Sequence, residues 1–134
     1  MFYRFVRAVV SFALRRFYML EVRGLPRDLS GPVILVGNHP NSIMDPALVF
    51  IITDRPVTFL AKAPLFKVPV FSLLLKGLQA LPVYRRQDDP TQMGKNEGTL
   101  TAASNALVEG RAITLFPEGI SHSEPHLAEI KTGC

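Results

Sequence analysis

The chain has only one cysteine, Cys134, and this scarcity excludes two ways of stabilising a fold. No internal disulfide can form, and nothing in the cysteine usage indicates an oxidising compartment. A zinc site built from clustered cysteines is excluded as well. His122 and His126 are four residues apart, but Pro125 lies between them and no acidic residue has metalloprotease spacing. We therefore expect no metal site.

The sequence also lacks repeats, low-complexity tracts and a Gly-x-Ser-x-Gly nucleophile elbow. Without the elbow a serine hydrolase is disfavoured, and Ser42 is better explained as a turn residue or helix cap. The 134 residues are 48% hydrophobic, which is enough for one buried core and too apolar for a disordered chain. These features predict one globular domain.

Positive charge is concentrated at the N-terminus. The net charge is +4, yet residues 1–27 carry six arginines against one glutamate, so the rest of the chain is slightly negative. A nucleic-acid-binding protein usually has a broad basic face, and we expect no nucleic-acid partner. A basic segment on a nearly neutral body favours attachment to an anionic membrane surface.

Residues 2–20 have the pattern of an amphipathic helix, with Arg4, Arg7, Ser11 and Arg15 along one stripe and apolar residues around the rest. Its charge-free stretch, residues 8–14, is too short to span a bilayer, so the helix should lie in the interface. A signal peptide and a helix packed on the domain are the alternatives. We divide the chain into a membrane-association helix, 1–20, and a catalytic-type domain, 21–134.

The rest of the chain alternates between strand and helix patterns. Strands are predicted at 33–37, 57–61, 80–84 and 112–116, and helices at 46–53, 69–76 and 97–109. This order is typical of an α/β fold with a mostly parallel sheet flanked by helices. The apolar segment 66–77 is a second candidate for membrane contact or for core packing, and residues 87–96 are expected to form a surface loop.

The segment 37–46, GNHPNSIMDP, places His39 and Asp45 just after a predicted strand. Ligand sites of α/β proteins lie at such strand ends. A histidine there can take a proton from a hydroxyl, and a carboxylate can hold its other nitrogen. Alternatively, His39 is a turn residue, and Asp45, which precedes Pro46, is the N-cap of the next helix.

A second polar turn follows the last predicted strand at 116–121, FPEGIS. The carboxyl ends of parallel strands meet at one edge of a sheet, so this turn should lie near His39. Arg85 and Arg86 follow the third predicted strand. A guanidinium is well suited to bind phosphate there, although a solvated turn explains these two residues equally well.

These segments together resemble the glycerolipid acyltransferase family, which includes glycerol-3-phosphate, dihydroxyacetone-phosphate and 1-acylglycerol-3-phosphate acyltransferases. The match covers nearly the whole chain. Asn38 and His39 with Asp45 are similar to the first family block, 81–85 (LPVYR) to the second, 116–121 to the third, and 130–133 (IKTG) to the stretch that follows. The family fold continues further, so we expect a C-terminally truncated domain.

The resemblance implies that His39 is the general base and that Asp45 orients it. It also implies that the glycerol phosphate is bound by residues of the other blocks, namely Asn38, Arg85, Glu118, Gly119, Ser121 and Lys131. Glu118 should order its loop so that backbone N–H groups face the anion, since its own charge repels phosphate. Five residues separate His39 from Asp45, where four are common in the family, and this variant is similar to the branch with fungal members.

The expected reaction is direct transfer of a fatty acyl group from acyl-CoA or acyl carrier protein to a hydroxyl of glycerol 3-phosphate or 1-acylglycerol 3-phosphate, as in phospholipid biosynthesis. The resemblance implies no cofactor. The expected partners are membrane lipids, the acyl donor and the glycerophosphate acceptor, at the cytoplasmic face of a membrane. A non-catalytic lipid-binding module or an inactive fragment is the alternative.

Overall fold

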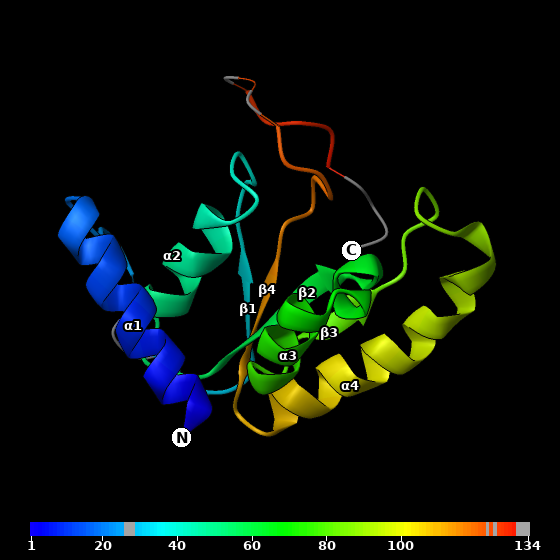
Figure 1. Ribbon diagram of the computed structural model, residues 1–134, viewed down its shortest axis with the longest axis horizontal. Coiled ribbons are helices and arrows are strands. Elements are labelled where there is room, and N and C mark those ends of the chain that lie inside the picture. The colour runs from blue at the N-terminus through cyan, green and yellow to red at the C-terminus, as the bar shows by residue number, and fades with distance from the viewer. Residues whose placement is uncertain (26–28, 123, 125, 131–134) are drawn as a thin grey trace.

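The computed structural model describes residues 1–25, 29–122, 124 and 126–130, and it is an α/β fold (Figure 1). The elements follow the order α1 (Phe2–Phe17), β1 (Val33–Val36), α2 (Met44–Ile52), β2 (Val57–Lys62), the 3₁₀ helix η1 (Ala63–Lys67), α3 (Pro69–Gly77), β3 (Leu81–Val83), the 3₁₀ helix η2 (Pro90–Lys95), α4 (Asn96–Val108) and β4 (Ala112–Leu115). The predicted alternation of strands and helices is confirmed.

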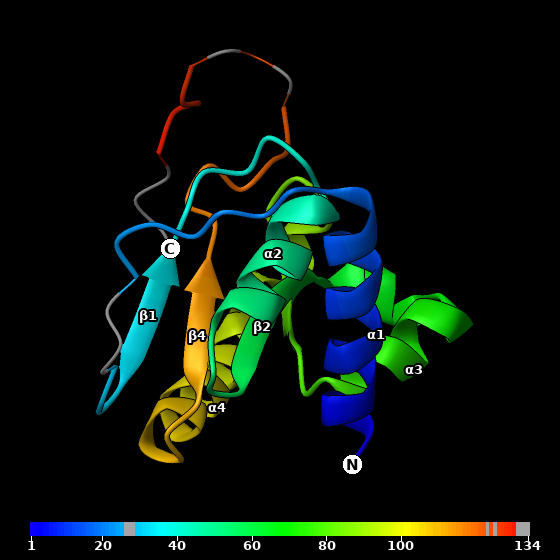
Figure 2. The ribbon, with the colours of Figure 1, turned by 90° about the vertical axis from the view of Figure 1, so that its left-hand side faces the viewer.

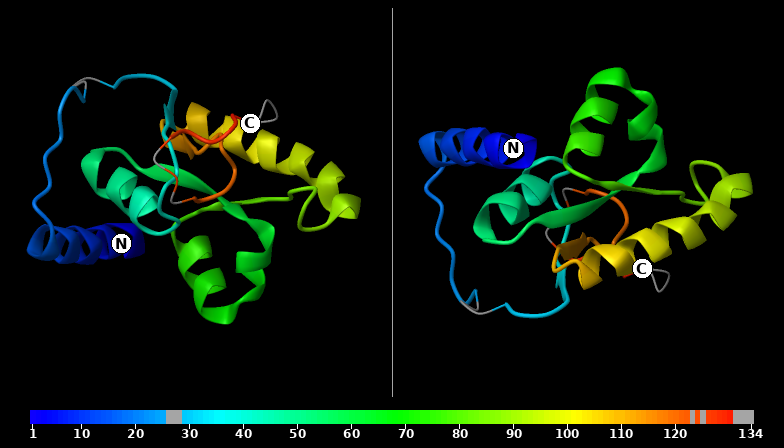
Figure 3. Two further views of the ribbon diagram at one scale, coloured as in Figure 1. Left: turned by 90° about the horizontal axis from the view of Figure 1, so that it is seen from above. Right: turned by 90° about the horizontal axis from the view of Figure 1, so that it is seen from below.

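The four strands form one parallel sheet in the order β1-β4-β2-β3. The last strand is therefore inserted between β1 and β2. Seen from above, α1, α2 and α3 lie on one side of the sheet and α4 lies on the other (Figure 3). All strands run in one direction, so the loops that follow them gather at the same edge, at the top of Figure 2.

The core lies between the sheet and the first helices, and α1 contributes to it directly. Leu14 of α1 is buried with Phe50, Ile51, Val57, Phe59, Ala80 and Ala112. The Tyr3 hydroxyl accepts a hydrogen bond from the Val57 N–H at 2.8 Å, and its ring meets the edge of Phe50. One face of α1 is thus packed on the domain, the alternative that its sequence left open.

Other details differ from the sequence-based expectation. The segment expected as a plain loop at 87–96 contains η2, whose first turn is capped by the Asp89 side chain on the Thr91 N–H. Arg7, expected to face water with the polar stripe of α1, instead donates to the Ile51 carbonyl at 3.4 Å and lies 3.5 Å from the Asp54 carboxylate. Hydrophobic periodicity does not indicate such local contacts.

Two arginines hold the amino-terminal edge of the sheet together. Arg55 donates to the carbonyls of Leu29, Gly31 and Gly110 at 2.5 to 3.1 Å, which ties the start of β1 to the start of β4. Arg111 donates to the Thr58 hydroxyl at 2.6 Å, and its burial lowers the pKa of its guanidinium. Both charges satisfy backbone or hydroxyl oxygens rather than carboxylates.

Replacing Arg55 with Met should lower the free energy of unfolding by at least about 2 kcal/mol, because hydrogen bonds from a charged group contribute about 1.5 to 3 kcal/mol each. Urea denaturation followed by circular dichroism measures the change. Arg86→Met, at an exposed arginine, is the matched control and should cost little. Equal stability of the two variants would contradict the assigned role of Arg55.

Candidate active site

Three loops meet at the carboxyl edge of the sheet, and the pairing of β1 with β4 sets their spacing. Val36 lies opposite Leu115 in the register, and the Gly37 N–H continues the ladder to the Leu115 carbonyl at 3.2 Å. The loop after β1 therefore begins beside the loop that starts at Phe116. The loop after β3 reaches the same edge through Arg85.

His39 and Asp45 form a hydrogen-bonded pair in the first of these loops. The imidazole Nδ1 lies 3.0 Å from the Asp45 Oδ2, and the two side chains are 17% and 16% exposed. The expectation that the longer spacing still allows contact is confirmed. Because a carboxylate only accepts, Nδ1 carries the hydrogen, and Nε2 is the ring nitrogen that can accept a proton.

Asn41 orders the turn between His39 and Asp45. Its side-chain Oδ1 accepts from the N–H groups of Ile43 and Met44 at 3.1 and 3.0 Å, so it caps the start of α2. Asp45 is not the N-cap, as the alternative interpretation had it, but lies in the first turn of the helix. Its Oδ2 also accepts from the Asn41 N–H at 2.7 Å, which fixes the carboxylate that holds the imidazole.

Phe116 joins the first loop to the loop after β4. Its ring is stacked on the His39 imidazole, with centroids 4.3 Å apart and planes 17° from parallel. This contact and the Asp45 hydrogen bond constrain the imidazole from two directions. Hydrophobic pattern assigned Phe116 to the end of a strand and gave no indication of a contact with the histidine.

Arg85 is bound at both ends of its guanidinium. Nε and Nη2 donate to the Asp88 carboxylate at 2.7 and 2.8 Å, and Nη1 donates to the Gly119 carbonyl at 3.0 Å. The hydrogen bond from Arg85 lowers the pKa of Asp88 from its usual value. Arg85, and not the exposed Arg86, is thereby attached to the loop after β4.

Glu118 closes that loop on itself. Its side chain is buried, with 2% of the residue exposed, and its Oε2 lies 2.5 Å from Nε2 of His122. Gly119 adopts a positive φ of 69°, which suits glycine, and its N–H bonds back to the Phe116 carbonyl at 3.0 Å. The Ser121 hydroxyl is buried in the same turn. The loop is therefore ordered by a carboxylate and an imidazole.

A pocket of about 360 Å³ lies beside Arg85. Its lining residues come from η1, β3, η2 and the segment between β3 and η2, and they are Ala63, Pro64, Phe66, Lys67, Pro82, Tyr84, Arg85, Asp88, Asp89, Gln92 and Lys95. Lys95 lies over the Tyr84 ring, 5.5 Å from its centroid. The cationic Lys95 and the aromatic Tyr84 thus line the same pocket as Arg85.

The remaining predicted site residues divide into two cases. Asn38 lies at the sheet edge and is exposed. Lys131 lies outside the described residues. Sequence reasoning missed the roles of Asn41, Phe116 and His122. His122 follows Glu118 by four residues in a polar turn, and this spacing could have indicated their contact. From the sequence, His122 was paired only with His126, as possible metal ligands.

A comparison with protein families finds a match to the family described as Acyltransferase over residues 19–134. Neither the curated proteins nor the solved structures contain a match to this chain.

Proposed function

Because the chain belongs to the acyltransferase family, we propose that it transfers a fatty acyl group to a hydroxyl of glycerol 3-phosphate or 1-acylglycerol 3-phosphate. The acyl donor is acyl-CoA or acyl carrier protein. The observation that carries this proposal is the His39–Asp45 hydrogen bond at the edge of the sheet where the three loops meet. It supplies a base at the same edge of the sheet as Arg85, a residue that suits a phosphorylated acceptor.

In the proposed reaction Nε2 of His39 takes the proton of the acceptor hydroxyl while that oxygen attacks the thioester carbonyl. The carbon–sulfur bond then breaks, and the thiolate leaves with the proton returned from the imidazolium. Asp45 accepts a hydrogen bond from Nδ1–H throughout, and its negative charge stabilises the positive charge of the ring. No covalent intermediate with the protein is required.

Arg85 is the proposed contact for the acceptor phosphate. Its bonds to Asp88 and Gly119 leave further N–H donors on Nη1 and Nη2, and guanidinium binds phosphate through two such donors at once. The adjoining pocket has the size usual for small-molecule sites. Lys67 and Lys95 in its wall favour an anionic ligand.

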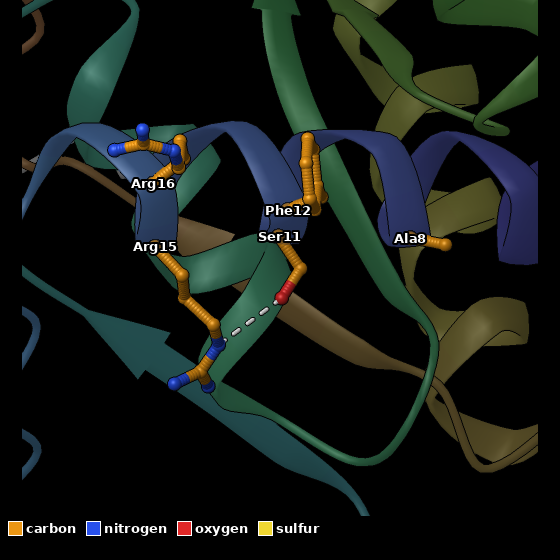
Figure 4. A pocket seen from close by; sticks show the side chains of 5 residues that line it. All are labelled: Ala8, Ser11, Phe12, Arg15 and Arg16. Atoms are coloured by element: carbon orange, nitrogen blue, oxygen red, sulfur yellow. Dashed lines mark hydrogen bonds between the residues drawn. The ribbon is translucent and has the colours of Figure 1, made fainter.

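The outer surfaces of α1 and α3 support the proposal of membrane attachment, for which the cytoplasmic face is the proposed location. On α1 the exposed apolar residues Phe5, Val9, Phe12 and Phe17 lie on sides not used for core packing, and α3 exposes Val70, Phe71, Leu73 and Leu74. The two helices meet where the Phe2 ring lies against Gly77. Figure 4 shows Phe12 on α1 with Arg15 and Arg16 beside it.

Arginines beside exposed aromatic rings favour the interface of an anionic bilayer. Within the described residues, no helix has the length and apolar character that crossing a bilayer requires. One side of α1 and the adjoining side of α3 therefore form the proposed membrane-binding surface.

His39→Ala should abolish acyl transfer, and Asp45→Asn should slow it by about 10²-fold or more, because general base catalysis contributes about 10² to 10⁴. The assay measures transfer of a radiolabelled acyl group from acyl-CoA to glycerol 3-phosphate or 1-acylglycerol 3-phosphate. Ser42→Ala, in the same loop, is the control and should keep its activity. Unchanged transfer in His39→Ala would exclude the base. Liposome binding without transfer in the unmodified chain would favour a non-catalytic module.

Arg85→Ala should raise the Michaelis constant for the acceptor by about 10- to 100-fold, because a lost charge-assisted contact costs about 1.5 to 3 kcal/mol. Arg86→Ala is the matched control at the next position. Steady-state kinetics with varied acceptor and saturating donor separate the two variants. A defect in Arg86→Ala with normal kinetics in Arg85→Ala would reverse the assignment.

The double variant Phe5→Ser/Phe12→Ser should weaken binding to anionic liposomes by more than about tenfold, because each buried aromatic side chain contributes about 1.5 to 3 kcal/mol. Point substitutions test this better than removal of residues 1–20, which would also remove Leu14 from the core. The matched control is Leu100→Ser/Val108→Ser on α4, at exposed positions on the other side of the sheet.

Co-sedimentation at low and high salt, with circular dichroism to verify folding, gives the comparison. Binding should fall as salt rises without disappearing. Equal losses in both double variants would contradict docking through α1.

A further inference from the structure

The loop after β4 contains a second histidine–carboxylate pair that the proposed reaction does not use. Nε2 of His122 lies 2.5 Å from Oε2 of Glu118. Glu118 is among the most buried side chains of the described residues, at 1% side-chain exposure, and the His122 side chain is 15% exposed. A carboxylate at such depth requires a hydrogen-bonded or charged partner, and His122 is positioned as that partner.

Three atoms of this loop are buried without a hydrogen-bond partner within the part of the chain that the structure describes. They are Oε1 of Glu118, Oγ of Ser121 and Nδ1 of His122. Buried polar atoms are satisfied in most native structures, and each unpaired one weakens the fold, so a cluster of three indicates a missing ligand or water. Two of the three, the serine hydroxyl and an imidazolium Nδ1–H, are donors suited to an anion.

The charge of Glu118 makes its partner important for any anion at this loop. A buried carboxylate beside a phosphate would repel it, because Coulomb interactions are strong where water is excluded. A protonated His122 would compensate that charge through Nε2–H and would keep its Nδ1–H available. Arg85 is attached to the same loop, through the hydrogen bond from its Nη1 to the Gly119 carbonyl.

We propose that His122 is an acceptor-binding residue that compensates the charge of Glu118 and, with the Ser121 hydroxyl, donates to the phosphate of the acceptor. This inference rests on the proposed function for the identity of the ligand. The ligand chemistry itself, a phosphate group, follows from the two unpaired donors and the nearby guanidinium.

Isothermal titration calorimetry with glycerol 3-phosphate and with inorganic phosphate tests the site without turnover. His122→Gln keeps an N–H donor for Glu118 but removes the positive charge, and it should weaken binding of both anions by at least about tenfold. Ser121→Ala should weaken binding to a smaller extent. His126→Gln, at an exposed histidine four residues later, is the control and should bind normally.

The double variant Glu118→Gln/His122→Gln distinguishes charge compensation from a merely structural role. If His122 compensates Glu118, removal of the carboxylate should restore part of the affinity that His122→Gln loses. If the pair only holds the loop, the double variant should bind as weakly as the single variant or more weakly. Circular dichroism verifies that every variant is folded.

Absence of phosphate binding in the unmodified chain, normal binding in His122→Gln, or no recovery in the double variant would each overturn the inference. Acyl transfer is measured separately with the same preparations. Phosphate binding that depends on His122 without any acyl transfer would contradict the proposed reaction and support the anion site. Transfer to glycerol 3-phosphate that does not depend on His122 would support the proposed reaction and contradict the anion site.

Discussion

The in-register parallel pairing of β1 with β4 is the constraint on which the candidate site depends. It places Val36 opposite Leu115, so the segments that follow β1 and β4 leave the sheet side by side. The Gly37 N–H still donates to the Leu115 carbonyl. A shift by one residue would turn every side chain of the shifted strand to the other face of the sheet and separate His39 from Phe116. The stacking of these two rings is therefore a consequence of the pairing of strands that are far apart in the sequence.

Hydrogen bonds at the opposite, amino-terminal edge of the sheet help to hold this register. Arg55 and Arg111 satisfy carbonyl and hydroxyl oxygens at the starts of the strands, away from the candidate site. At the carboxyl edge the histidines, Arg85 and Glu118 are attached to loops, whose positions depend on a few hydrogen bonds.

The sequence predicted the strands well because each is a short apolar run, and two of them are bounded clearly, β1 by Gly37 and β4 by Pro117 after Phe116. The alternation of these strands with helices predicted a parallel sheet, in which their carboxyl ends lie at one edge. It also predicted contact between His39 and Asp45. It did not predict that Asn41 would cap α2, since a capping side chain and a turn residue look alike in a single sequence. Nor did it predict the Asp88 partner of Arg85, because this ion pair depends on the turn between them.

The amphipathic pattern of α1 was ambiguous for a related reason. Apolar residues cover most of the helix, and periodicity does not show which of them pack on the protein and which face water or a membrane. The structure divides them, with Leu14 and Tyr3 on the core and Phe5 and Phe12 exposed. The same helix thereby contributes to folding on one side and offers an unoccupied surface on the other.

If Arg85 binds an anion as proposed, the Asp88 carboxylate competes with that anion for the guanidinium. Any incoming group must either displace Asp88 or accept only the N–H donors that Asp88 and Gly119 leave. A dianionic phosphate is attracted to the guanidinium more strongly than a singly charged ion is. Competition with the Asp88 carboxylate would therefore favour ligands of higher negative charge at this position.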